Sequence, residues 1–331
     1  MNRSVLSSLL LLVSAGCQQR PVLEGANLAG LRELADAVDG DLLMEDVREL
    51  AAAHGSETPL DCRDFNFADR LCHLTHLDAR ALMRSKLEAL GYEVSAFDTE
   101  DGLFSTSALI AEKRGTSRPD EVVLVGAHYD AFYQGADDNN SGVSGVLELA
   151  RLFSGRAFDR TVRFVGFDLE ELGLAGSIRY VASLPREERI VAALVFDCIG
   201  YSSTVPGSQM SVPGLPSRDT GDFLAVIAND VSLSRALEVR ALVDELSLIP
   251  SLTLVAPGDG SAPLAGNLMH SDHAPFWLDG RPAVFMTDTA IFRNPHYHRD
   301  TDTPDTLDPA FLRGAVQVAA ASLAYWAGGP R

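Results

Sequence analysis

The chain has 331 residues, of which 46% are hydrophobic and 22% are charged. This composition is that of a globular protein with a sizeable buried core, and it excludes a largely disordered chain. The formal net charge of −19, together with the lack of a long basic run, argues against nucleic acid as a partner, because binding to phosphates depends on Lys and Arg.

The first residues have the pattern of an export signal. Arg3 precedes the apolar run Val5 to Val13, which is too short to span a bilayer, and small residues then lead to Cys17. The stretch LLVSAGC resembles the bacterial lipobox, in which the Cys becomes the lipid-modified first residue of the mature chain. We therefore expect residues 1–17 to be a lipoprotein signal peptide, with an ordinary secretory signal as the alternative. Gln18 after the Cys favours an anchor in the outer membrane, facing the periplasm or the cell surface.

Three further cysteines follow in the mature chain. Cys62 and Cys72 are close in sequence, and in an oxidising compartment they form either a local disulfide or two buried thiols. Cys198 lies in an apolar run and is predicted to be a small core residue. Residues 18–77 are predicted to be a tether and N-terminal segment, and residues 78–331 one main domain.

Helix and strand patterns alternate from Asp78 onward. Leu82, Leu87 and Leu90 share one face of a predicted helix that ends near Gly91. Further along, short apolar runs predict strands and amphipathic runs predict helices. The predicted strands cover residues 93–97, 107–112, 122–125, 161–168, 190–200 and 283–287, and the predicted helices cover residues 142–153, 175–184, 222–246 and 309–326. Residues 202–219, rich in Ser, Pro and Gly, are predicted to form a surface loop near the functional site.

This alternation is typical of a parallel sheet with helices on both faces. We therefore predict a three-layer α/β/α sandwich with a central, mainly parallel mixed sheet. Ligands of such sheets bind beyond the carboxyl ends of the strands.

Polar side chains that could bind a metal follow the buried strands where each strand ends, or lie in two loops, GADDNNSG and NPHYHRDTDTPD. They are His128, Asp130, Asp137, Asp138, Glu170, Glu171, Asp197, His296 and His298. Several buried carboxylates at adjacent strand ends call for a divalent cation. A mixture of His and carboxylate ligands suits zinc or another late first-row ion.

The segments VGAHYD, GADDNNSG, FDLEELGLAGS, VFDCIG, SDHAPF and YHRDTDTPDTLD, in this order, resemble the two-zinc exopeptidases. That family includes secreted bacterial aminopeptidases and glutamate carboxypeptidase-like enzymes. The resemblance covers residues 82–326 and implies that residues 78–331 form a zinc peptidase domain acting on peptide substrates.

The resemblance implies a set of ligands for two zinc ions. His128 and Asp197 would bind one ion, Glu171 and His298 would bind the other, and Asp138 would bridge the two. His298 is preferred to His296 because the family's ligand directly follows the Tyr.

The resemblance also implies roles in catalysis. Glu170 would be the general base that takes a proton from the shared water. Asp130 would hydrogen-bond His128 and fix its tautomer, and Tyr297 would donate a hydrogen bond to the developing oxyanion. A second group, His270, Asp272 and His273, either supports the site or packs its loop.

The leading interpretation is an aminopeptidase that releases N-terminal residues. The same ligands also serve carboxypeptidases, and relatives with one zinc ion perform glutaminyl cyclisation. A non-catalytic binding module with the same fold is an alternative from another class. The sequence lacks GxSxG and HExxH, which argues against a serine hydrolase and a zincin. The preferred side chain and the oligomeric state stay open.

Overall fold

The computed structural model describes residues 23–59, 72–100, 105–212 and 218–330. The predicted signal peptide, Cys17 and Cys62 lie outside the described residues. Cys72 is disulfide-bonded, and Cys198 is a free, buried cysteine, as predicted for a core residue.

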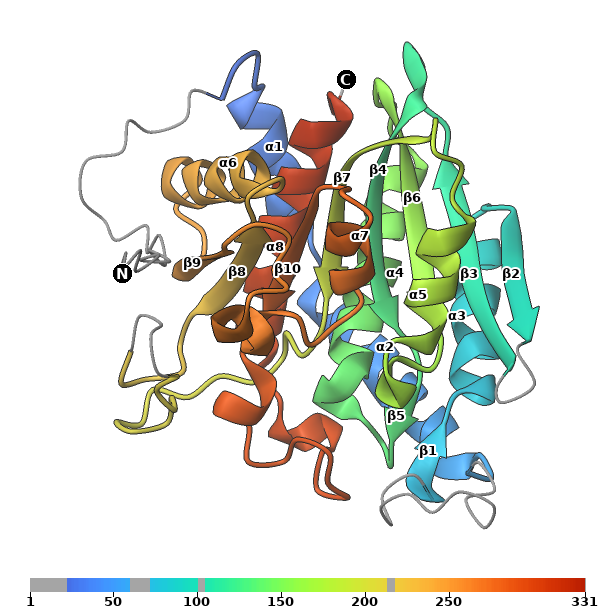
Figure 1. The fold of residues 1–331 in the computed structure, drawn as a ribbon, viewed down its shortest axis with the longest axis vertical. Coiled ribbons are helices and arrows are strands. Elements are labelled where there is room, and N and C mark those ends of the chain that lie inside the picture. The colour runs from blue at the N-terminus through green and yellow to red at the C-terminus, as the bar shows by residue number, and fades with distance from the viewer. Residues whose placement is uncertain (1–22, 60–71, 101–104, 213–217, 331) are drawn as a thin grey trace, which may run out of the picture.

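An eight-stranded mixed sheet forms the centre of the described structure (Figure 1). In spatial order its strands are β2 (Val94–Glu100), β3 (Ser105–Lys113), β6 (Arg160–Phe167), β4 (Arg118–His128), β7 (Arg189–Phe196), β10 (Ala283–Thr287), β8 (Leu224–Asn229) and β9 (Ser251–Ala256). The four central strands, β6, β4, β7 and β10, run parallel. β3 and β8 run antiparallel to β6 and β10. A separate short pair joins β1 (Leu74–Thr75) to β5 (Ala131–Phe132).

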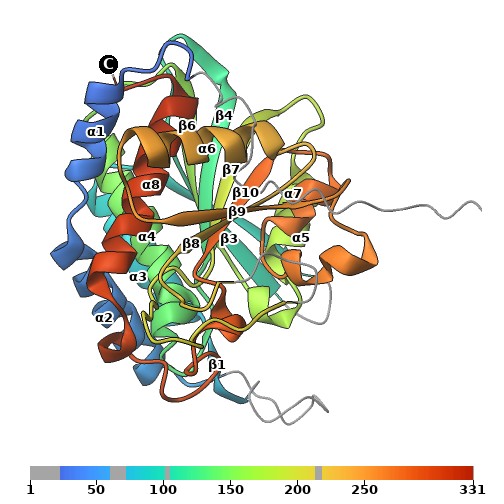
Figure 2. The same cartoon turned by 90° about the vertical axis from the view of Figure 1, so that its left-hand side faces the viewer.

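Helices cover both faces of this sheet (Figure 2), so the predicted α/β/α sandwich is confirmed. One face carries α1 (Leu28–Asp36), α2 (Gly40–Ser56), α3 (Leu77–Ala89), α4 (Gly142–Ser154), α6 (Leu233–Glu245) and α8 (Pro309–Ala327). The other face carries α5 (Ala175–Ser183) and α7 (Ala274–Leu278).

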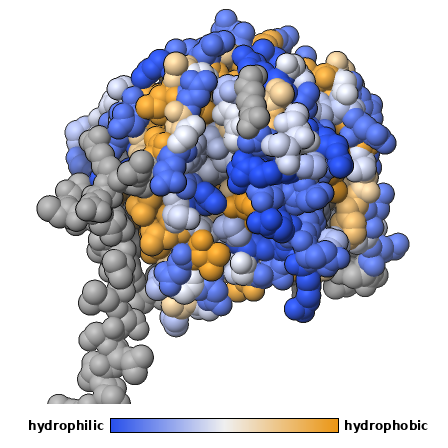
Figure 3. Space-filling model, turned by 90° about the horizontal axis from the view of Figure 1, so that it is seen from above, coloured by the Kyte–Doolittle hydropathy of each residue, from blue (hydrophilic) through white to orange (hydrophobic). Residues whose placement is uncertain are grey.

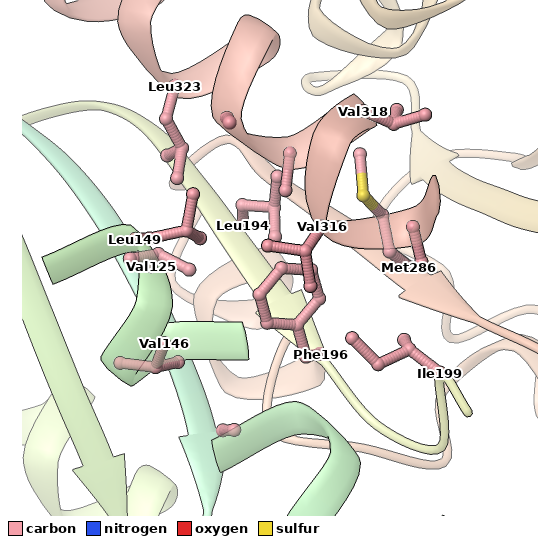
Figure 4. Packing of buried hydrophobic residues seen from close by; sticks show 14 of the residues in the cluster. Val125, Val146, Leu149, Leu194, Phe196, Ile199, Met286, Val316, Val318 and Leu323 are labelled. Carbon is pink, nitrogen blue, oxygen red and sulfur yellow. The ribbon is translucent and has the colours of Figure 1, made fainter. Parts of the chain in front are cut away.

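The central strands are buried on both faces because alternate side chains point to opposite sides. In β4, Val123 and Val125 belong to the core under α4 and α8, whereas Val122 and Leu124 belong to the core under α5 and α7. Figure 4 shows the first of these cores, where residues of β4 and β7 face Leu149 of α4 and residues of α8. This double burial explains why the strand is almost continuously apolar.

The N-terminal helices share the core on the α8 face. Leu34 of α1 and Leu43 and Val47 of α2 are buried in the same cluster as residues of α4 and α8. Arg313 of α8 also donates a hydrogen bond to the carbonyl of Val38, between the two helices. Residues 28–56 therefore pack as part of the main body, and the division at residue 78 stays a prediction.

The predicted helix over residues 222–246 is wrong in its first half. Residues Leu224–Asn229 form β8, all of them buried, and the helix α6 begins only at Leu233. β8 pairs with β10 on one side and β9 on the other, and these pairings satisfy its backbone groups. β9 was not predicted, because SLTLVA lies between loops that carry no strand signal of their own.

None of the helices in the described ranges has the length and hydropathy needed to cross a bilayer. Viewed from above, the surface is hydrophilic over much of its area, and hydrophobic residues gather in smaller patches (Figure 3).

Candidate metal centre

The metal-binding candidates meet at one edge of the sheet, towards the bottom of Figure 1. His128 is the last residue of β4, Asp197 directly follows β7, and η3 (Glu170–Leu172) follows β6 after two residues. Because these three strands are parallel neighbours, their carboxyl ends lie side by side.

Two groups of three side chains are close enough to hold a metal ion each, and they share Asp138. In the first group, His128 Nε2 lies 3.4 Å from Asp138 Oδ1 and 3.7 Å from Asp197 Oδ1. In the second group, His298 Nε2 lies 3.0 Å from Asp138 Oδ2 and 2.9 Å from Glu171 Oε1. The two oxygens of Asp138 thus face different groups, which is the arrangement of a bridging carboxylate.

The loop that carries Asp138 is held by a buried acid from late in the chain. This loop is η2 (Ala136–Ser141), and the carboxylate of Asp302 accepts hydrogen bonds from the backbone N–H groups of Asp137, at 3.0 Å, and Asp138, at 3.2 Å. Gly135 enters the loop with φ +52°, and a Cβ there would collide with the backbone oxygen of Asp138. The loop therefore needs both the distant acid and the glycine.

Asp130 holds the loop that carries the two glutamates. Its carboxylate oxygens accept hydrogen bonds from the N–H groups of Glu170, at 3.0 Å, and Glu171, at 3.1 Å. His128 Nδ1 contacts Asp130 twice, with a hydrogen bond to the backbone oxygen at 3.0 Å and a 3.3 Å approach to Oδ1. Asp130 thus lies beside the imidazole of His128, as predicted, and it also holds the backbone of Glu170 and Glu171 in position.

His298 reaches the centre from a turn in the last third of the chain. It has φ +58°, and its ring packs edge-on against Phe132 of β5 with a centroid separation of 4.9 Å. The ring of Tyr297 stacks on His298 at 3.8 Å. His296 instead contacts Thr301, at 3.0 Å, and belongs to neither metal-binding group.

The chemistry of these groups fits a divalent cation such as zinc. His128 Nε2 and Glu171 Oε1 are buried and make no hydrogen bond, although each faces other ligand atoms. Burial, helped by the charge of Asp138 and opposed by His298, raises the pKa of Glu171 to about 8. Burial likewise raises the pKa of Glu170 well above its usual range, with His128 opposing the shift. A bound cation would keep such carboxyls ionised.

A mostly apolar pocket opens beside the metal-binding groups and shares Asp197 with the first of them. Tyr297, which stacks on His298, also lines it. Its apolar wall comes from β8, β9, β10 and the loops around residues 210 and 291. The apolar side chains that line it are Met210, Val212, Phe223, Ile227, Leu252, Leu254, Leu268, Phe285, Ala290, Ile291 and Phe292. The predicted loop over residues 202–219 thus contributes to the pocket through its described part. Among the described residues that line the pocket, none is Lys or Arg.

The group formed by His270, Asp272 and His273 divides between three places. His270 lines the pocket. His273 is fully buried, bonds the carbonyl of Leu268 at 2.8 Å and stacks on Phe285, so it packs the core. Asp272 is fully buried near the centre, and its charge acts on Glu170.

The sequence did not reveal the supports supplied by Asp302 and Asn294. Asn294 donates a hydrogen bond to Asp137 Oδ2, at 2.6 Å, and so joins the loop after β10 to the loop of Asp138. The only signal was the density of polar residues in NPHYHRDTDTPD, which does not distinguish a ligand from a support.

The fold and the ligand geometry are those of an α/β protein with a candidate metal centre at the carboxyl ends of its parallel strands. Residues 108–239 match the model of Peptidase family M28. The resemblance to two-zinc exopeptidases is therefore confirmed.

Individual relatives agree with this class. The chain is 33% identical over 205 residues to the uncharacterized protein YfbL of Escherichia coli K12, covering 56% of this chain and 61% of the relative. It is 37% identical over 113 residues to the aminopeptidase YwaD of Bacillus subtilis, covering 34% of this chain and 24% of the relative. The chain thus spans less than two thirds of the length of these relatives.

The LapA aminopeptidase of Legionella pneumophila has a similar fold. The two structures superpose with a TM-score of 0.69 at 20% identity, and the match covers 95% of this chain and 79% of that one. At this identity the similarity supports the fold rather than the activity.

We predict that zinc stabilises the chelator-treated protein. If zinc binds only the folded state and its free concentration is about a thousand times its Kd, the free energy of unfolding rises by about 4 kcal/mol. For a domain of this size, Tm then rises by roughly 10 °C. Thermal melts with and without zinc measure this shift. Asp138→Ala, which removes the shared ligand, should abolish most of it, whereas the exposed Glu187→Ala should leave it intact. An equal shift in Asp138→Ala would contradict the assignment.

Proposed function

We propose that the chain is an aminopeptidase that uses two zinc ions to release N-terminal residues from peptides. The observation that carries this proposal is the placement of Asp138, with one carboxylate oxygen towards each ligand group. One of those groups includes Asp197, which also lines the apolar pocket. His128 and Asp197 would hold one ion, Glu171 and His298 the other.

When bound, zinc would lower the pKa of a water from about 15.7 towards about 7 and polarise the peptide carbonyl. The carboxylate of Glu170 then accepts the water proton and transfers it to the nitrogen of the leaving amine. Tyr297 is suited to donate a hydrogen bond to the oxyanion, because burial raises the pKa of its phenol and keeps the proton in place. Asp130 maintains the position of Glu170 through the backbone.

The pocket favours an aminopeptidase over a carboxypeptidase. A carboxypeptidase needs a cationic group to bind the terminal carboxylate of its substrate. No Lys or Arg is among the described lining residues, which include Asp197, several neutral polar side chains, His270 and the apolar wall. Arg293, which lies nearby, donates to Gln209 and to the carbonyls of Tyr201 and Phe223. A peptide with a free amino terminus and an apolar first side chain suits these surroundings.

We predict that Glu170→Gln lowers kcat by about 10²- to 10⁴-fold, because the amide cannot accept the water proton. Hydrolysis of leucine p-nitroanilide measures the effect, with zinc content determined in parallel. Glu187→Gln, a change at an exposed glutamate, should retain the wild-type kcat. Unchanged turnover in Glu170→Gln would reject Glu170 as the base. Release of ammonia from N-terminal Gln without peptide cleavage would point to a cyclase.

We also predict a preference for large apolar N-terminal residues. Burying one such side chain contributes about 1.5–3 kcal/mol, so kcat/KM for leucine or phenylalanine anilide should exceed that for glutamate anilide at least about tenfold. N-acetylated substrates should not be cleaved. Ile291→Asp, at the exposed rim of the pocket, should reduce kcat/KM for leucine, whereas Leu278→Asp on α7 should not. Equal rates for all side chains would contradict this selectivity.

We further propose that the protein is exported and anchored by a lipid on Cys17. The lipobox-like stretch LLVSAGC supports this proposal. Cells grown with radiolabelled palmitate should label the wild-type chain and leave Cys17→Ala unlabelled. A wild-type chain without label would instead support an ordinary secretory signal.

A further inference from the structure

A second buried carboxylate, Asp168, lies at the start of the glutamate loop. Asp168 directly follows β6, is 1% exposed, and stands two residues before Glu170. Its Oδ1 lies 2.7 Å from Nδ1 of His76, and its Oδ2 accepts a hydrogen bond from the N–H of Ser107 in β3 at 2.9 Å. Asp168 therefore ties the start of the glutamate loop to two other parts of the chain.

His76 is itself held firmly. It is 7% exposed and lies between β1 and α3, where Thr75 of β1 pairs with Ala131 of β5. Its N–H donates to one carboxylate oxygen of Glu57 at 3.1 Å, and the N–H of Asp78 donates to the other at 2.9 Å. The imidazole therefore projects from a fixed position onto Asp168.

The backbone between Asp168 and α5 needs such external support. Leu169 has φ +49°, Gly173 has φ +79° and Leu174 has φ +63°. For the two leucines, the left-handed conformation costs about 1–2 kcal/mol each and persists only where the surroundings enforce it. Asp130 accepts hydrogen bonds from the N–H groups of Glu170 and Glu171, and Asp168 anchors the entry to the loop through His76 and Ser107.

The contact between His76 and Asp168 has the character of a charge-assisted hydrogen bond. Burial acts to lower the pKa of His76, but the hydrogen bond and the charge of Asp168 outweigh burial and raise it. If the imidazole is lost, the buried carboxylate loses its partner at Oδ1 and keeps the Ser107 N–H at Oδ2. The cost of an undercompensated buried charge then favours movement of the loop.

We propose that His76 is a positioning residue that acts through Asp168 to hold the loop of Glu170 and Glu171 in the geometry needed for proton transfer and metal binding. The proposal rests on the proposed peptidase function. It gives the N-terminal segment, which lies outside the residues matched to the family, a part in building the centre.

A matched pair of substitutions tests this role. Asn at position 76 places an amide nitrogen near the position of Nδ1, whereas Gln places it near Nε2. His76→Asn should therefore retain kcat within about threefold, and His76→Gln should lower kcat by about 10- to 100-fold with KM little changed. His73→Leu is the control, because His73 stacks on Tyr133 instead, and it should keep the wild-type kcat.

The second measurement does not depend on activity. Hydrogen exchange of the chelator-treated protein, followed by mass spectrometry, should be about tenfold faster in residues 168–174 of His76→Gln and unchanged elsewhere. The proposal would be overturned if His76→Asn and His76→Gln had the same kcat and the same hydrogen-exchange rates. Faster hydrogen exchange along the whole chain of His76→Gln would also overturn it. If the wild-type protein cleaves no aminoacyl anilide, the proposed function fails, and the exchange data alone decide the role of His76.

Discussion

Buried carboxylates gathered at one sheet edge are the constraint on which the rest of the structure depends. Asp138, Glu171 and Asp197 are almost fully removed from water, and the imidazoles of His128 and His298 lie beside them. Isolating such charges costs several kcal/mol each unless a cation or hydrogen-bond donors compensate. Because of this cost, the acids at this edge lie next to backbone N–H donors or imidazoles, and a divalent cation would compensate the remaining negative charge.

Other acids at this edge serve as supports. Asp130 and Asp302 each accept two backbone N–H groups, and each thereby fixes a loop that presents a metal-binding candidate. The support from Asp130 matters because the glutamate loop is flanked by left-handed residues, Leu169 and Leu174, that an unsupported chain would avoid. The parallel strands from which these loops extend hold the ends of the loops in place.

The metal-binding candidates and the apolar pocket come from different parts of the chain. Residues 108–239, which match the peptidase family, contain four of the five metal-binding candidates. Most side chains that line the apolar pocket come later, from β9, β10 and the segment around residue 291. A family match in the first part therefore supports the reaction more strongly than it supports a particular substrate.

The sequence by itself determined the alternating α/β pattern and the buried central strands, and it indicated the candidate metal-binding residues that the structure brings together. These features are local: β4 is apolar because both faces are buried, and His128, Glu171 and Asp197 directly or closely follow strand ends. Only the tertiary structure decided that residues 224–229 form a strand, because partners on both sides, β9 and β10, stabilise it. It also decided that Asp302 supports Asp138 and that His76 meets Asp168. Those contacts join residues 164 and 92 positions apart, and long-range hydrogen bonds of this kind leave no periodic signal in the sequence.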